Sequence, residues 1–233
     1  MDPNFGDKEA RAGVFIGLLA YFMWGIFPVY FKWIASVDPL EVLGHRVVWA
    51  VPFGAIIIVA RRQWPEVRRA LVDRTMLAWL ALAALCISTN WLIYIWAVQN
   101  DRIFETSLGY YINPLMYVGV GVALLGERLR RLQMVAVALA SFGVLFLTIS
   151  GGAFPWVALS LAGLFTAYGV IRKKIAIGAM PGLFIETLLL FPVAALWMSW
   201  LVATQQASLT AGDAGLSALL VLGGPVTVLP LLF

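Results

Sequence analysis

Long apolar runs separated by short polar connections dominate the chain. A helix that crosses a membrane needs about 20 predominantly apolar residues. Runs of about that length therefore predict an all-α fold: a polytopic helical membrane protein with eight transmembrane helices. The predicted spans are residues 12–34, 40–60, 75–98, 105–125, 132–150, 156–171, 181–204 and 216–233.

Composition supports this pattern and removes several classes of protein. The chain is 62% hydrophobic and 12% charged, whereas an ordinary soluble domain is about 45–50% apolar and about 25% charged. This excludes a disordered chain and a soluble enzyme with a water-facing surface. Cys86 is the only cysteine and His45 the only histidine. We therefore expect no disulfide, no metal site of thiolate or His-Glu-x-x-His type, and no enzyme.

The basic residues predict an orientation in the membrane. A net charge of +4 in a soluble protein would indicate nucleic-acid binding, but here the basic side chains lie in short loops, so we expect no nucleic-acid partner. Of the 16 Lys and Arg residues, 13 lie on one side of the predicted bundle, and Lys32 and Arg102 lie on the other. Positive charge marks the cytoplasmic side, which predicts a cytoplasmic N-terminus.

A weak internal repeat suggests two related halves. Trp24-Gly25 has a counterpart in Tyr168-Gly169, and the segment 40–43 has one in 185–188. A unit of five helices is odd, so the second copy would be inverted in the membrane, as in many transporters. The predicted repeats are residues 12–150 and 155–233, the second with three helices. We therefore expect a truncated chain; chance similarity between apolar segments is the alternative.

Three ionisable residues fall in the predicted span 40–60. Each costs about 3 kcal/mol or more inside a bilayer, which makes it a candidate functional residue. Glu41, His45 and Trp49 share one helix face, and Glu41 with His45 is predicted to couple proton movement. Arg46 is predicted to face a polar cavity and attract an anionic group such as a carboxylate. The alternatives are an interfacial Glu41, a neutral hydrogen-bonding His45 and a structural ion-pair network around Arg46.

The predicted span 105–125 carries polar residues near the bilayer centre. Thr106, Tyr110, Asn113 and Tyr117 form one stripe along the helix. Pro114 cannot donate a hydrogen bond to the carbonyl of Tyr110, which predicts a kink at this depth. Such a helix would suit a polar solute. Hydrogen bonding between helices by Asn113 is the alternative.

Two further predicted spans contribute polar or aromatic residues. Asn90 and Tyr94 lie one helical turn apart in span 75–98, and Trp24 precedes a second predicted kink at Pro28. Because four helices supply such residues at similar depth, we predict a cavity in which Trp24 and Tyr110 offer aromatic contact. The predicted substrate path consists of Trp24, His45, Arg46, Asn90, Tyr94, Tyr110 and Asn113.

Several segments in a fixed order resemble one protein family. They include AYFMWGIFPVYFK at 20–32 and ETSLGYYINP at 105–114. The segments resemble the RarD proteins of the EamA family, within the drug/metabolite transporter superfamily of bacterial inner membranes. The resemblance runs from about residue 12 to the end of the chain. Its other segments are residues 45–49, 90–96, 126–130 and 168–173.

This resemblance implies a fold and a function. The fold is ten helices in two inverted repeats of five, and the chain departs from it by lacking the last two helices after Phe233. The function is secondary transport of small metabolites or drugs by alternating access, in the manner of an exporter or permease, without an ATPase or bound cofactor. The expected partners are a small-molecule substrate, carboxylate-bearing or amphipathic, and the lipid bilayer. The alternatives are a non-transporting substrate-binding or scaffold protein and an inactive truncated transporter.

Overall fold

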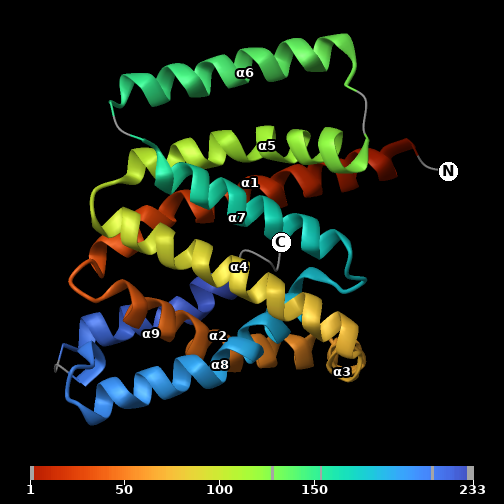
Figure 1. The fold of residues 1–233 in the computed structure, drawn as a ribbon. Helices are drawn as coiled ribbons and strands as arrows, with labels where there is room; N and C mark the ends of the chain where they lie inside the picture. The colour runs from red at the N-terminus through yellow and green to blue at the C-terminus, as the bar shows by residue number, and fades with distance from the viewer. Residues whose placement is uncertain (1–2, 127–128, 153, 211–212, 230–233) are drawn as a thin grey trace. The chain divides into compact units, whose positions relative to one another are not determined.

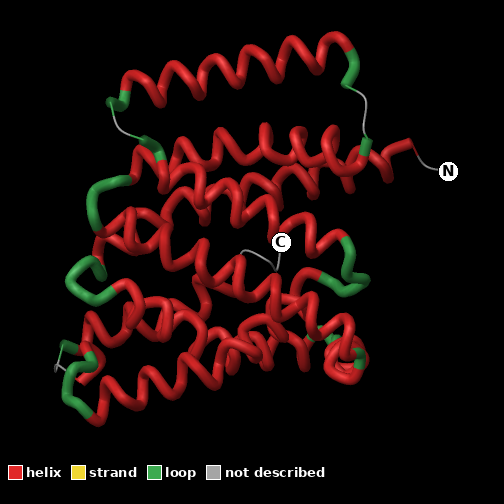
Figure 2. Tube along the Cα trace, viewed as in Figure 1, coloured by secondary structure: helices red, strands yellow, loops and turns green. Residues whose placement is uncertain are grey.

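The computed structural model describes residues 3–126, 129–152, 154–210 and 213–229, and its regular structure within these ranges is entirely helical (Figures 1 and 2). In chain order the elements are α1 (Pro3–Trp33), α2 (Pro39–Ala60), α3 (Trp64–Val72), α4 (Arg74–Gln99), α5 (Ile103–Leu125), α6 (Arg131–Ser150), α7 (Trp156–Lys173), α8 (Ala179–Ala203), the 3₁₀ turn η1 (Ser208–Thr210) and α9 (Ala214–Val228).

Each predicted apolar run corresponds to one long helix, which confirms the all-helical class. The largest difference is at α1, which begins at Pro3 rather than residue 12. The short helix α3 and the turn η1 were not predicted. Residues 230–233 of the last predicted span, and Glu127 and Arg128 of segment 126–130, lie outside the described residues.

Several helices have the length and apolar composition that crossing a membrane requires. Among the described residues four meet both conditions, while α9 is apolar but shorter. These features support a polytopic membrane protein, and the figure of eight spans stays a prediction. The four long helices are α2, α4, α6 and α8.

Local sequence signals explain where helices begin and end. Asp38, Asp73 and Asp213 precede α2, α4 and α9, and the side chain of each accepts backbone N–H bonds from two or three residues further on. This is the usual role of aspartate at a helix start. Helix α5 ends at Gly126, whose φ of +66° lies in the left-handed region that glycine tolerates best.

The chain divides into two compact units, residues 1–77 with 177–233 and residues 78–176. In the first unit, α2 packs against α8 and α9. Helices α2 and α8 run antiparallel. Gly44, near the start of α2, faces Met198 near the end of α8, while Gly54, further along α2, faces Phe184 near the start of α8. At Gly224, α9 approaches the main chain of α2 at Trp49.

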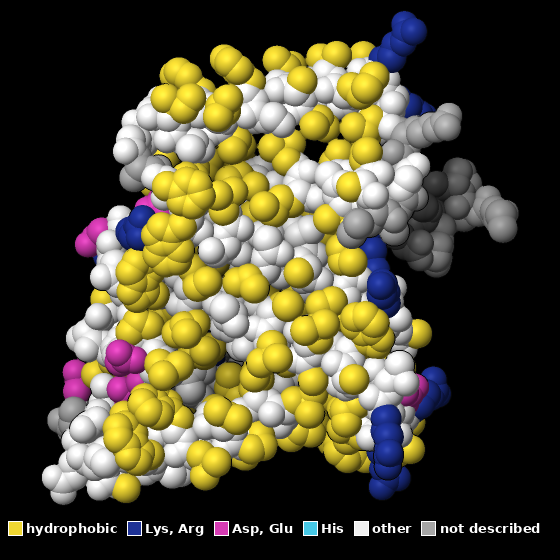
Figure 3. Space-filling view, in the orientation of Figure 1, with side chains coloured by type: hydrophobic (Ala, Val, Ile, Leu, Met, Phe, Trp, Pro, Cys, Tyr) yellow, Lys and Arg dark blue, Asp and Glu magenta, His cyan; other side chains and the backbone are white. Residues whose placement is uncertain are grey.

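The second unit is built around the pair α5 and α7, which lie side by side (Figure 1). Its core cluster consists of Leu108, Ile112, Ala158 and Ala162. Helix α6 contacts α5, but none of its residues is buried. Figure 3 shows hydrophobic side chains along its outer face, as expected of a helix that meets lipid.

Candidate substrate-binding site

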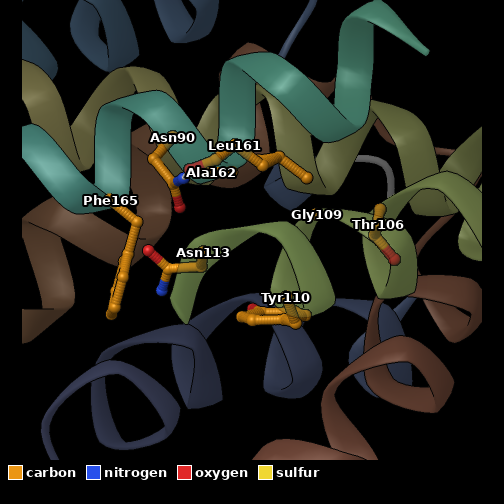
Figure 4. A pocket seen from close by; sticks show the side chains of 8 residues that line it. All are labelled: Asn90, Thr106, Gly109, Tyr110, Asn113, Leu161, Ala162 and Phe165. Carbon is orange, nitrogen blue, oxygen red and sulfur yellow. Dashed lines mark hydrogen bonds between the residues drawn. The ribbon is translucent and has the colours of Figure 1, made fainter. Parts of the chain in front are cut away.

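A small, partly open pocket lies between α4, α5 and α7 in the second unit, with a cavity volume of about 10 Å³. Helix α4 contributes one side chain, α5 contributes four residues and α7 contributes three (Figure 4). None of the lining residues is charged. They are Asn90, Thr106, Gly109, Tyr110, Asn113, Leu161, Ala162 and Phe165.

Asn90 forms the α4 side of this pocket. Its side chain is only 9% exposed, and its Nδ2 donates a hydrogen bond to the carbonyl of Leu161 at 3.0 Å. Within the described part of the chain, no group donates to its Oδ1. Asn90 lines the pocket, so its Oδ1 is an acceptor that a ligand can use.

Asn113 forms the α5 side. Its Oδ1 accepts a hydrogen bond from Thr166 Oγ1 of α7 at 2.9 Å. Its Nδ2 donates to no group in the described ranges, which leaves two N–H donors for a ligand. One turn further on, Tyr117 donates to the carbonyl of Phe165 at 3.2 Å. Two residues of the predicted stripe on α5, Asn113 and Tyr117, therefore bind α7.

Aromatic rings surround these amides. Tyr94 of α4 and Tyr110 of α5 meet edge to face, with ring centroids 6.3 Å apart. Figure 4 shows Phe165 and Tyr110 lying beside the amide of Asn113. Four of the predicted path residues thus gather around this pocket: Asn90, Tyr94, Tyr110 and Asn113.

A larger, open groove between α5 and α7 lies beside the pocket, with a volume of about 660 Å³. Thr166, which binds Asn113, lines this groove too. The other lining residues are apolar or glycine: Met116, Gly119, Val120, Ala123, Gly163, Ala167, Val170 and Ile171. A polar pocket and an apolar groove therefore adjoin within one unit.

In the first unit, Glu41 and His45 lie together on α2, as predicted from their spacing. Glu41 is buried, and its carboxylate accepts hydrogen bonds from the backbone N–H and the hydroxyl of Ser208, at 2.7 and 2.8 Å. His45 Nε2 lies 3.8 Å from Glu41 Oε1, and Trp49 Nε1 donates to His45 Nδ1 at 3.3 Å. Because Nδ1 accepts, the proton of the neutral imidazole lies on Nε2, which faces the carboxylate.

Arg46 is also buried in the first unit. Its Nε donates to Thr227 Oγ1 of α9 at 3.0 Å, and its guanidinium lies 5.4 Å from the ring centroid of Phe31. These contacts resemble the structural network that the sequence left open as an alternative. Attraction of an anionic group by Arg46 stays a prediction.

Trp24 and Pro28 belong to α1. Trp24 is 44% exposed, and Pro28 lies inside the helix. Pro114 likewise lies inside α5. The kinks at both prolines, and the place of Trp24 on a substrate path, stay predictions.

Sequence reasoning missed several residues that line the pocket or form hydrogen bonds in the structure. Phe165 of α7 lines the pocket, and Thr166 of α7 binds Asn113. Ser208 binds Glu41, and Glu66 accepts a hydrogen bond from the backbone N–H of Gly178 at 2.6 Å. The only available signal for Thr166 was a hydroxyl in an apolar run. Among the described residues, no group of three His, Cys, Asp or Glu side chains could hold a metal ion.

Comparison with known proteins identifies the family. Residues 11–149 match the EamA-like transporter family. An uncharacterized transporter of Vibrio cholerae is 45% identical over all of this chain and 76% of its own length. Proteins named RarD from Salmonella typhimurium and Escherichia coli K12 are 44% and 43% identical, over 97% of this chain and 76% of their own length. No solved structure matches the chain.

These matches confirm the resemblance seen in the sequence motifs. They cover the helices that build the pocket in the second unit, and the relatives are similar over nearly the whole of this chain. The protein therefore belongs to the EamA-like transporter family and is a homologue of the RarD proteins.

Proposed function

We propose that the protein is a secondary transporter that moves a small metabolite or drug across the bacterial inner membrane by alternating access, as an exporter or permease with a cytoplasmic N-terminus. The observation that carries the proposal is the pocket of amide side chains within apolar helices. Asn90 and Asn113 each lie well inside their helix and keep hydrogen-bonding atoms for a ligand. Polar groups at such depth are costly and are usually functional.

The substrate path in this proposal includes Asn90, Tyr94, Tyr110 and Asn113. The apolar groove beside Thr166 supports an amphipathic substrate, because a polar head at the amides leaves an apolar part next to the groove. Along α5 the groove extends from Met116 to Ala123, about 10 Å at 1.5 Å per residue.

Glu41 and His45 are the proposed proton-coupling pair. The Nε2 proton of neutral His45 faces the Glu41 carboxylate. A second proton on His45 would occupy Nδ1, which accepts the hydrogen bond from Trp49 Nε1. Protonation of His45 therefore breaks the hydrogen bond between His45 and Trp49. In the same proposal Trp24 offers aromatic contact and Arg46 attracts an anionic substrate group.

A reciprocal arrangement in the first unit supports an inverted repeat. The helix that follows α2 binds the start of α8, through Glu66 and the N–H of Gly178. The turn that follows α8 binds the start of α2, through Ser208 and Glu41. Since α2 and α8 run antiparallel, these two carboxylate contacts lie at opposite ends of the helix pair, as two copies related by inversion would place them.

Alternating access requires that the two ends of the α2–α8 helix pair open in turn. We call the Glu66–Gly178 and Glu41–Ser208 contacts latches, because each is proposed to hold one end closed. In the proposed orientation, Glu66 closes the cytoplasmic end and Glu41 closes the outer end. Replacing a carboxylate by an amide weakens such hydrogen bonds by about 1 kcal/mol. That is about a fivefold change in the ratio of closed to open states.

Removing the donor side chain of Asn113 is expected to lower transport strongly. Proteoliposomes that contain the Asn113→Ala variant should accumulate the substrate about tenfold more slowly than the wild type, because the proposed hydrogen bond from Nδ2 to the substrate is lost. The measurement is mass spectrometry of the contents of sealed vesicles incubated with a bacterial metabolite extract under an imposed pH gradient. Protein-free vesicles give the background.

The matched control is Asn100→Ala, which removes an exposed asparagine outside the pocket. Its rate should equal that of the wild type. Equal rates for Asn113→Ala and wild type, with equal protein in the vesicles, would show that the pocket is not on the path. Substrate binding without accumulation would instead favour a non-transporting binding protein.

The latches are expected to control access at opposite ends. In a Cys86→Ser background, Glu66→Gln should raise the labelling of Met180→Cys by a membrane-impermeant maleimide. Glu41→Gln should raise that of Ala207→Cys. Both reporter positions are buried, at 3% and 4% exposure. Labelling is measured in vesicles of each orientation, and an increase at both reporters from either variant would contradict independent latches.

A further inference from the structure

We propose that the pocket between α4, α5 and α7 selects an uncharged group that both donates and accepts hydrogen bonds, such as a carboxamide on a flat ring, and excludes carboxylates and ammonium groups. This inference rests on the proposed function, because it concerns the chemistry of the same site. It goes further by assigning the substrate a neutral hydrogen-bonding group at this pocket.

The hydrogen bonds already formed decide which atoms a ligand meets. Asn90 uses Nδ2 on the Leu161 carbonyl, which fixes the orientation of its amide and leaves Oδ1 as the acceptor. Asn113 accepts from the Thr166 hydroxyl through Oδ1, and in this arrangement its Nδ2 is left as the donor. Figure 4 shows both amides reaching into the space between α4, α5 and α7. A ligand therefore meets one amide acceptor and one amide donor.

A carboxamide matches this pair, and a charged group does not. A carboxylate has no N–H or O–H for Asn90 Oδ1, so two oxygen acceptors would face each other. An ammonium group could donate to Asn90, but it accepts nothing from the Asn113 amide. None of the eight lining residues carries a charge that would offset the desolvation of either ion.

The walls of the pocket are aromatic and aliphatic, which suits a flat, partly apolar group. The rings of Tyr110 and Phe165 border it, and Leu161 and Ala162 supply aliphatic surface. In this conformation the cavity measures about 10 Å³, which is room for about one water molecule. A ligand group therefore enters only when the pocket widens, and a flat single ring requires less widening than a large drug.

Three probes that share one ring test the selectivity. Benzamide, benzoate and benzylammonium are titrated into the full chain in lipid nanodiscs, and binding is measured by saturation-transfer NMR and calorimetry. We expect benzamide to bind at least about tenfold more tightly than either ion, because each ion leaves a buried polar atom without a partner. Equal affinity for the three probes, or no binding of any of them, overturns the proposal.

Two variants locate the binding. Asn113→Asp keeps an oxygen for Thr166 but removes the donor, so benzamide should bind about tenfold more weakly while benzylammonium gains affinity. Asn90→Ala should weaken benzamide by a similar factor, and Asn100→Ala should leave its affinity unchanged. Unchanged benzamide affinity in Asn113→Asp and Asn90→Ala, with both variants monodisperse, places the binding elsewhere and overturns the proposal.

These outcomes are separate from those of the transport assay. Benzamide selectivity without any flux in proteoliposomes supports the pocket chemistry and contradicts only the transport function. Flux that depends on Asn113 but shows equal inhibition by benzoate and benzamide supports transport and overturns the selectivity.

Discussion

Replacing Gly224 by valine is expected to prevent α9 from packing on α2. A Cβ atom at this position would lie 2.5 Å from the carbonyl carbon of Trp49 and 2.6 Å from its oxygen. These are main-chain atoms inside a helix, so they cannot rotate away as a side chain would. Overpacking usually costs about 1–3 kcal/mol, and we expect this rigid contact to cost at least about 3 kcal/mol.

The measurement is the apparent melting temperature in detergent together with the monodisperse fraction after purification. Gly143→Val is the matched control, because an added Cβ at Gly143 in α6 meets nothing within 4 Å. It should change stability by less than about 0.5 kcal/mol. A Gly224→Val protein that melts with the wild type would contradict the close approach of α2 and α9.

Replacing Glu41 by alanine is expected to cause the second large loss of stability. The carboxylate is 3% exposed and accepts two hydrogen bonds from Ser208. Hydrogen bonds to a charged group contribute about 1.5–3 kcal/mol each, and their removal leaves the Ser208 donors without an acceptor. We expect a loss of about 3 kcal/mol, measured as the free energy of unfolding in mixed detergent micelles.

A double-mutant cycle separates this contact from other effects of Glu41. Ser208→Ala removes only the hydroxyl and should cost about 1 kcal/mol, since the backbone N–H still donates. Glu41→Ala and Ser208→Ala together should cost less than their sum, with a coupling of about 0.5–3 kcal/mol. Strict additivity would show that the two groups do not stabilise each other.

The lengths of the apolar runs predicted the long helices, because each run is unambiguous in length and composition. They missed α3 for a physical reason: Trp64–Val72 is short and carries Glu66, Arg68 and Arg69, so it reads as a polar loop. Only Val67 and Ala70, three residues apart, are buried. A single pair of apolar residues is too weak a signal to predict a helix.

The pocket was predicted in part. Spacing on single helices placed Asn113 on one stripe with Thr106, Tyr110 and Tyr117, and in the structure Asn113 and Tyr117 bind α7. Spacing could not identify Thr166 as the partner of Asn113, because the two are 53 residues apart and belong to different helices. The same limit hid the pairing of Glu41 with Ser208, which lies 167 residues away.

The contacts that join α4 and α5 to α7 differ in their tolerance to substitution. Asn90 and Tyr117 donate from side chains, whereas Leu161 and Phe165 accept through main-chain carbonyls. A substitution can remove either donor, but any residue placed at 161 or 165 retains the acceptor. Substitutions on α7 at positions 161 and 165 therefore keep both hydrogen bonds. Substitutions of Asn90 on α4 or Tyr117 on α5 remove the donor and lose the hydrogen bond.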